Sequence, residues 1–172
     1  MPDIFTAEKR SQIMSRIKAS GTVPERQLYD LVRLVLGRRW RIDSNVQNLP
    51  GRPDIVIRSL SLVIFMDGCF YHSCPVHGHI PKSNKAYWSP KLGRTTQRDK
   101  SNRRRLRSRG YAVWRFWEHD LKPASIDRTH NNLSKRLLRR KAAIREAKTD
   151  SASRVLLAVH TVLYSRTATE NG

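Results

Sequence analysis

The sequence has few cysteines, few acidic residues and no long hydrophobic run. Its only cysteines, Cys69 and Cys74, are too few for the disulfide framework of a secreted domain of this size. We interpret them as reduced thiols and as candidate metal ligands. The first residues lack the pattern of a secretory signal. The most apolar stretches, residues 60–66 and 155–164, are much shorter than the ~20 residues that cross a bilayer. We therefore expect a soluble cytoplasmic protein that does not bind a membrane.

Acidic side chains are also scarce, because 14 Asp and Glu stand against 34 Lys and Arg, for a formal net charge of +20. Such a charge is typical of proteins that bind polyanions, since neutralising phosphates releases condensed counterions. Ribosomal or chromatin binding would explain the charge as well as catalysis on nucleic acid. The composition thus predicts a nucleic-acid partner and a place at the nucleoid. It does not by itself indicate that the protein is an enzyme.

What is present is a regular alternation of helical and strand patterns. Apolar residues at three- and four-residue spacing predict helices at residues 6–20, 23–36 and 125–148, and a long basic stretch that Gly110 stops predicts a helix at residues 89–109. Short runs of residues that favour β-strands predict strands at residues 40–43, 54–58, 60–66 and 111–117. The run at 60–66 is apolar enough for the centre of a sheet covered on both faces. This order predicts an α/β fold with a mixed central sheet flanked by helices.

Asp54 is the first candidate for chemistry. It follows Pro50-Gly51-Arg52-Pro53 and precedes an apolar strand. An isolated Asp at a strand start is usually a turn residue, but here it would project from the edge of the sheet. Mg²⁺ binds one or two carboxylates, water and sometimes a backbone carbonyl. The side chain of Asp67 and the backbone carbonyl of Met66, at the end of the neighbouring strand, are rival second ligands.

The segment from Cys69 to His79 is the stronger signal. Zn²⁺ takes four tetrahedral sulfur or nitrogen ligands, and Cys69, Cys74 and His77 are three local candidates. The fourth would be His79, or His119 if the strand at 111–117 lies beside the strand at 60–66. The alternative is a loop without metal, in which the cysteines are small buried apolar residues. We expect structural zinc.

Zinc would fix the loop and turn its intervening residues outward. Phe70 and Tyr71 would then be exposed aromatic side chains able to unstack bases, unless Phe70 turns inward to cover the metal. His72 titrates near neutral pH and suits the role of a general base on water, although an isolated His is more often a simple hydrogen-bonding group.

Two further acids have a structural and a functional interpretation each. Asp99 lies in a strongly basic stretch, where it would pair with helical neighbours or orient His72 and raise its basicity. Glu25 lies three residues after Thr22, the spacing of a capping box, and could alternatively hold metal-bound water.

Taken together, these motifs resemble the very-short-patch-repair (Vsr) mismatch endonucleases. The resemblance spans residues 6 to 138 approximately and rests on four segments: Leu49-Pro50-Gly51-Arg52-Pro53-Asp54, residues 63–72 (Val-Ile-Phe-Met-Asp-Gly-Cys-Phe-Tyr-His), Gln97-Arg98-Asp99 and residues 114–119. Residues beyond about 148 lie outside it. We therefore expect an endonuclease domain at 1–148 and a C-terminal extension of unassigned role at 149–172.

The resemblance implies a restriction-endonuclease-like fold with a structural zinc. It implies a Mg²⁺-dependent nick beside the T of a T·G mismatch in double-stranded DNA, by a monomer that could work with mismatch-repair proteins. Its expected site residues are the following: Asp54 and the Met66 carbonyl on Mg²⁺, with Asp67 demoted; His72 as base; Asp99 and Glu25 as supporting acids; Cys69, Cys74, His77 and His119 on zinc; and Met14, Phe70 and Tyr71 as wedges in the DNA.

This sequence departs from the family pattern at particular positions. Tyr71 stands where Trp is usual in the family. His119 stands where a Cys can occur, and its imidazole can replace that thiol as a zinc ligand. Cys74 and His77 differ in type or spacing from some members, so His79 stays an alternative ligand.

Two other functions compete with mismatch nicking. One is a restriction-type nuclease on the same fold that cuts matched or modified DNA. The other is a zinc-bearing DNA-binding module without catalysis, and the joint presence of Asp54, His72 and Asp99 argues against it.

Overall fold

The computed structural model describes residues 8, 9, 12 and 21–169, and the side chains of these residues up to 150. The predicted helix at 6–20, and Met14 within it, lies outside the described residues apart from 8, 9 and 12. The chain divides into two compact units, Met1–Leu133 and Ser134–Gly172. The sheet and both candidate sites belong to the first unit.

The sheet has four strands in the order β1-β2-β3-β4. They are β1 (Asp43–Ser44), β2 (Ile55–Ile57), β3 (Leu62–Asp67) and β4 (Ala112–Trp117). β1, β2 and β3 pair antiparallel, while β3 and β4 pair parallel with Asp67 opposite Trp117. The predicted mixed α/β sheet is therefore confirmed, with the apolar β3 in its interior.

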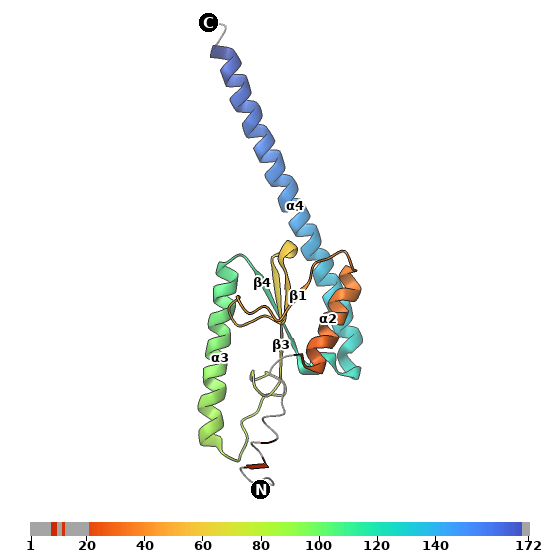
Figure 1. Cartoon of the computed structure of the whole chain (residues 1–172), viewed down its shortest axis with the longest axis vertical. Helices are drawn as coiled ribbons and strands as arrows, with labels where there is room; N and C mark the ends of the chain where they lie inside the picture. Colours follow the sequence, from red (N-terminus) through yellow and green to blue (C-terminus); the bar gives the residue numbers. More distant parts are fainter. Residues whose placement is uncertain (1–7, 10–11, 13–20, 170–172) are drawn as a thin grey trace. The chain divides into compact units, whose positions relative to one another are not determined.

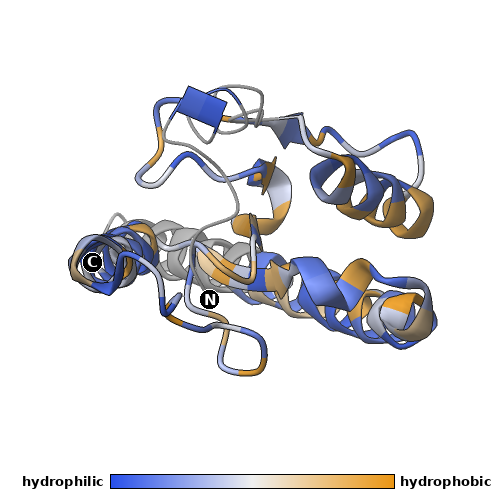
Figure 2. Cartoon of the chain, turned by 90° about the horizontal axis from the view of Figure 1, so that it is seen from below, coloured by the Kyte–Doolittle hydropathy of each residue, from blue (hydrophilic) through white to orange (hydrophobic). Residues whose placement is uncertain are grey.

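The helices cover the sheet from two sides. α2 (Val23–Leu36) and α3 (Lys85–Ser108) lie on either side of it in Figure 1. On the α3 side, Leu106 packs against Val56 and Val63, all fully buried. The next residues along the strands, such as Ile55 and Ile64, point to the other face, where α2 buries Leu28 and Val32. Figure 2 shows hydrophobic and hydrophilic residues on the same helices, as expected for helices with one face on a sheet.

Local sequence explains the ends of α2. The Thr22 hydroxyl accepts from the Glu25 N–H at 3.4 Å, and Gly37 ends the helix at φ 78°, with its N–H donating to the Arg33 carbonyl. Both ends of the predicted helix at 23–36 are confirmed, because capping and apolar spacing agree there.

Other boundaries differ from the prediction by one residue or more, and three of the differences matter most. β1 is a two-residue strand that starts at Asp43 rather than at residue 40. A 3-10 turn, Arg58–Leu60, occupies the end of the predicted strand at 54–58 and the start of the one at 60–66. α3 starts at Lys85 rather than Ser89 and contains Pro90. The added first turn of α3 carries Trp88, whose ring lies 4.9 Å from that of Phe70. Tertiary packing thus overrides a local helix-start pattern.

The last helix, α4 (Pro123–Thr169), runs past the predicted end at residue 148. It spans the boundary between the two compact units. Within the described part of the chain, every helix is too short or too polar to cross a membrane.

Candidate active site and metal centre

A pocket of about 1020 Å³ opens beside the C-terminal end of β3. Its wall includes Glu25 from α2, Asp54 from the turn before β2, Asp67 from β3, His72 from the loop after β3, and Asp99 from α3. The sheet register explains part of this assembly, because the antiparallel pairing of Ile55 with Ile64 sets the residue before β2 beside the end of β3. All four predicted catalytic residues thus share one pocket.

Asp54 is held by the backbone of β3. Its Oδ2 accepts the Met66 N–H at 2.7 Å. Burial raises the pKa of Asp54 to about 6, and the charges of Glu25 and Asp67 add to this rise, although the Met66 hydrogen bond opposes it. A half-buried carboxylate close to two other acids is destabilised when ionised, and a cation would relieve that cost. The donor set at Asp54 therefore fits a hard divalent cation.

Glu25 secures the start of α2 through a variant of the predicted capping box and also lines the pocket. Its Oε2 accepts the Gly21 N–H at 2.7 Å, and its Oε1 accepts the Thr22 hydroxyl at 2.8 Å. The helix start thus fixes the carboxylate that lines the pocket near Asp54. The two interpretations of Glu25 are compatible.

His72 and Asp99 form a direct pair. The His72 Nδ1 lies 2.7 Å from the Asp99 Oδ2, across 27 positions of sequence. Burial lowers the pKa of His72, but the Asp99 hydrogen bond and the charge of Asp67 outweigh burial and give a net rise. With Nδ1 engaged by Asp99, Nε2 is the nitrogen that can take a proton from water. This pair has the geometry of a base with its orienting acid.

Asp67, the rival metal ligand, has other partners. Its Oδ2 accepts from the Arg115 Nε, and its Oδ1 lies 3.5 Å from the His72 Nδ1. The Arg115 guanidinium stacks over Trp117 at 4.5 Å. The sequence reasoning missed Arg115, and its only signal was the alternation that puts Arg115 and Trp117 on one face of the predicted strand.

The two aromatic residues of the loop form a cluster instead of standing alone. The ring of Phe70 lies 5.1 Å from that of Tyr71 and 4.9 Å from that of Trp88, both edge to face. Sequence reasoning also missed Trp88, which carried no pattern beyond the Tyr87-Trp88 pair ahead of the basic helix. The third predicted wedge, Met14, lies outside the described residues.

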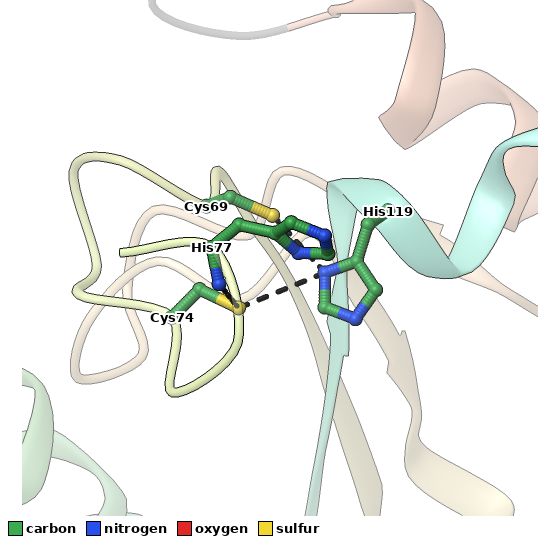
Figure 3. Close-up of side chains that lie close together, drawn as sticks. All are labelled: Cys69, Cys74, His77 and His119. Atoms are coloured by element: carbon green, nitrogen blue, oxygen red, sulfur yellow. Dashed lines mark hydrogen bonds between the residues drawn. The ribbon is translucent and has the colours of Figure 1, made fainter. Parts of the chain in front are cut away.

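A second group gathers at the same end of the sheet (Figure 3). The ligand atoms of Cys69, Cys74, His77 and His119 all lie within 4.8 Å of one another. His119 Nδ1 lies 3.1 Å from the sulfur of Cys69 and 3.6 Å from that of Cys74. It reaches them because β4 runs parallel to β3 and ends beside it. The predicted alternative, His79, stays outside the group and its Nδ1 lies 3.3 Å from the His77 carbonyl.

The surroundings of this group suit a tetrahedral metal. The N–H groups of Val76 and His77 each point to the Cys74 sulfur at 3.4 Å, and the His119 Nε2 lies 3.6 Å from Asp120. Such outer contacts orient metal ligands. Gly78 permits the tight turn, because a Cβ there would lie 2.4 Å from the Cys74 carbonyl oxygen. Burial raises the pKa of the Cys69 thiol, so a cation is needed to favour its thiolate. Two thiols and two imidazoles fit zinc.

Comparison with known proteins agrees with this geometry. The family model "DNA mismatch endonuclease Vsr" matches residues 2–77. The chain is 32% identical over 123 residues to the DNA mismatch endonuclease Vsr of Escherichia coli K12, covering 69% of this chain and 74% of that protein. The chain belongs to the Vsr family.

Two other relatives are more similar to this chain in sequence. The type II nicking enzyme V.NmeAIP of Neisseria meningitidis is 41% identical over 137 residues, covering 77% of this chain and 93% of the relative. The type II nicking enzyme V.NaeI of Lentzea aerocolonigenes is 40% identical over 129 residues, covering 71% and 77%. Membership identifies this protein as a DNA endonuclease of the mismatch type.

Proposed function

We propose that this protein is a Mg²⁺-dependent endonuclease that nicks the strand at the T of a T·G mismatch, in very short patch repair. The observation that carries the proposal is the shared pocket of Asp54 and the His72–Asp99 pair, whose Nδ1–Oδ2 distance is 2.7 Å. A half-buried acid with a raised pKa, in one pocket with a histidine that an acid polarises, suits hydrolysis of a phosphodiester.

In this mechanism Asp54 and the Met66 carbonyl would hold Mg²⁺, which supplies Lewis-acid stabilisation of charge on the phosphate. His72 Nε2 takes a proton from the attacking water, and Asp99 stabilises the resulting imidazolium. The water oxygen forms a bond to phosphorus while the bond to one deoxyribose oxygen breaks, and that oxygen takes a proton from solvent. Glu25 orients water beside Asp54.

The remaining groups recognise the DNA or support the loop that carries the site residues. Phe70 and Tyr71 would enter the base stack beside the mismatch, together with Met14. Zn²⁺ on Cys69, Cys74, His77 and His119 would hold the loop that carries them and His72. We assign the catalytic domain to residues 1–148, with a restriction-endonuclease-like fold, and the extension to 149–172. A charge of +20 supports a place at the nucleoid. The proposal also includes a cytoplasmic monomer assisted by mismatch-repair proteins.

A second candidate is nicking of matched or modified DNA, because the relatives at 40% and 41% identity are named type II nicking enzymes. Two end-labelled duplexes that differ only in T·G against T·A or C·G, incubated with Mg²⁺ at physiological salt, separate the two. A nick at the T confined to the mismatched duplex supports repair. Equal nicking of both duplexes favours the second candidate, and nicking of neither contradicts both.

A further inference from the structure

Arg103 is a cation of the pocket that the mechanism above does not use. It lies on α3 four residues after Asp99, so both side chains share one helix face, and Arg103 is half-buried in the pocket wall. Burial lowers the pKa of Arg103, and the charge of Arg115 lowers it further. The guanidinium stays charged, because its ordinary pKa is far above neutral.

The acids near Arg103 are committed elsewhere. The charges of Asp99 and Asp67 act on Arg103, yet Asp99 uses Oδ2 for His72 and Oδ1 for a 3.7 Å ion pair with Arg98. Asp67 bonds to Arg115 and contacts His72. Among the residues that the structure describes, Arg103 has no hydrogen bond or ion pair. A guanidinium with its donors unused, in a pocket with catalytic groups, is suited to receive an anion.

We propose that Arg103 is a catalytic residue that binds two oxygens of the scissile phosphate. This inference rests on the proposed function. The planar guanidinium matches two phosphate oxygens with parallel N–H donors, a geometry that Lys cannot reproduce. As the water oxygen bonds to phosphorus, negative charge grows on those oxygens, and Arg103 stabilises it from the α3 side of the pocket. The Arg103 contact therefore strengthens towards the transition state.

A purely structural role for Arg103, as a counter-charge for Asp67 and Asp99, is the competing explanation. Arg104 supplies the matched control, because it is the next residue of α3, carries the same charge and is exposed outside the pocket. Both substitutions remove one positive charge from the same helix. A difference between them therefore reports the pocket rather than the net charge.

The experiment compares Arg103→Gln, Arg103→Lys and Arg104→Gln in single-turnover nicking with saturating DNA, on whichever duplex the wild type cuts. We expect Arg103→Gln to slow the nicking step by ~10²–10³, as for loss of one transition-state donor. Arg103→Lys should fall between it and the wild type. Arg104→Gln should leave the rate within about twofold and weaken binding only slightly at physiological salt. Thermal unfolding of each variant checks the fold.

A phosphorothioate at the cut phosphate distinguishes direct binding of the phosphate by Arg103 from a purely structural role of Arg103. Sulfur at an oxygen that Arg103 binds should slow the wild type, and this penalty should shrink in Arg103→Lys and Arg103→Gln. Equal sulfur penalties in wild type and variants, or equal rates for Arg103→Gln and Arg104→Gln, would overturn the role of Arg103. Nicking of a matched duplex alone would overturn the mismatch proposal while leaving this test intact. A wild type that cuts no duplex would overturn both.

Discussion

The two candidate metal sites lie at the same end of β3, and the chain builds them in different ways. The Cys/His group takes three of its members from residues 69–77 and one, His119, from the turn after β4. The pocket around Asp54 takes its acids from α2, the turn before β2, β3, α3 and the turn after β4. One group is therefore mainly local and the other is assembled from segments that are distant in sequence.

The two sites differ in their effect on stability: the Cys/His group should stabilise the fold, whereas the Asp54 pocket should serve catalysis at a cost in stability. A metal bound by a local loop adds its binding energy to folding, since the unfolded chain does not hold the four ligands together. The Asp54 pocket, in contrast, gathers carboxylates that repel one another and raise the pKa of Asp54 to about 6. Such a site costs stability and is useful only when a cation and substrate enter. Damage to the two sites should thus have opposite signatures.

The largest expected effect is the loss of nicking in Asp54→Ala. Removing the carboxylate that would hold Mg²⁺ should cost at least ~4 kcal/mol of transition-state stabilisation, about a thousandfold in rate. The fold should be kept, because the substitution also removes a penalised charge. Single-turnover nicking and thermal melting measure the two effects together.

DNA binding without Mg²⁺ is the control for this variant, and it should be unchanged within a few fold because basic residues dominate it. Residual nicking at the wild-type rate in Asp54→Ala would contradict the assignment of the pocket as the active site.

The Cys/His group should fail in the opposite way. Cys74→Ser, or removal of the metal by a strong chelator, should lower the unfolding free energy by about 4 kcal/mol if metal is normally present at ~1,000 times its Kd. For a chain of this size that lowers the Tm by roughly 10 °C. Thermal melting with measured zinc content tests this.

His77 and His79 offer a matched pair for this test. His77→Ala should lose zinc and melt early, whereas His79→Ala should keep both properties, because His79 lies outside the ligand group. Equal behaviour of the two variants would argue against the ligand set seen in Figure 3.

Sequence patterns specified the local elements and named the four acidic and histidine residues of the pocket, but they did not specify contacts that depend on how the strands pair. α2 could be predicted to the residue, because Thr22, Gly37 and the apolar spacing act within one helix. The choice between His79 and His119 could not be made, since it depends on β4 lying parallel to β3. The ion pair of Arg115 with Asp67 likewise exists only through that pairing. Trp88 was missed because its contact with Phe70 is tertiary.

A smaller effect is expected from the aromatic cluster. Base stacking on an aromatic ring is worth ~1–3 kcal/mol, so Phe70→Ala should slow nicking of a mismatched duplex by about tenfold or more. Trp88→Ala should act partly through Phe70, because their rings lie 4.9 Å apart. The double variant should therefore lose less than the sum of the two single losses. Tyr87 is half-exposed and its ring contacts that of Trp88 at 5.2 Å, so Tyr87→Ala should cost less than Phe70→Ala, and an equal loss would contradict the role of Phe70.

The smallest expected effect concerns Asp99→Asn and depends on pH. The pKa of His72 is raised above its ordinary value of 6.5. The contribution of His72 to stability is therefore complete below pH 6.5 and is lost as the pH rises through the raised pKa. Burial acts to raise the pKa of Asp99, but the hydrogen bond to His72 and the charge of His72 outweigh burial and give a net decrease. The contribution of Asp99 to stability is therefore complete above pH 3.8 and is lost as the pH falls through the lowered pKa. Asp99→Asn should therefore cost most, about 1 kcal/mol, between pH 3.8 and 6.5, and less once the pH exceeds the raised pKa of His72.

The same substitution tests His72 as the base. Only neutral His72 accepts a proton, so the nicking rate of the wild type should fall as the pH drops through its raised pKa. Without the Asp99 charge that pKa decreases, and the acidic limb of the rate profile should move to lower pH even as the maximal rate declines. The ring signals of His72 in an NMR titration give the pKa directly. A limb that stays in place while the His72 pKa falls would mean that another group takes the proton from water.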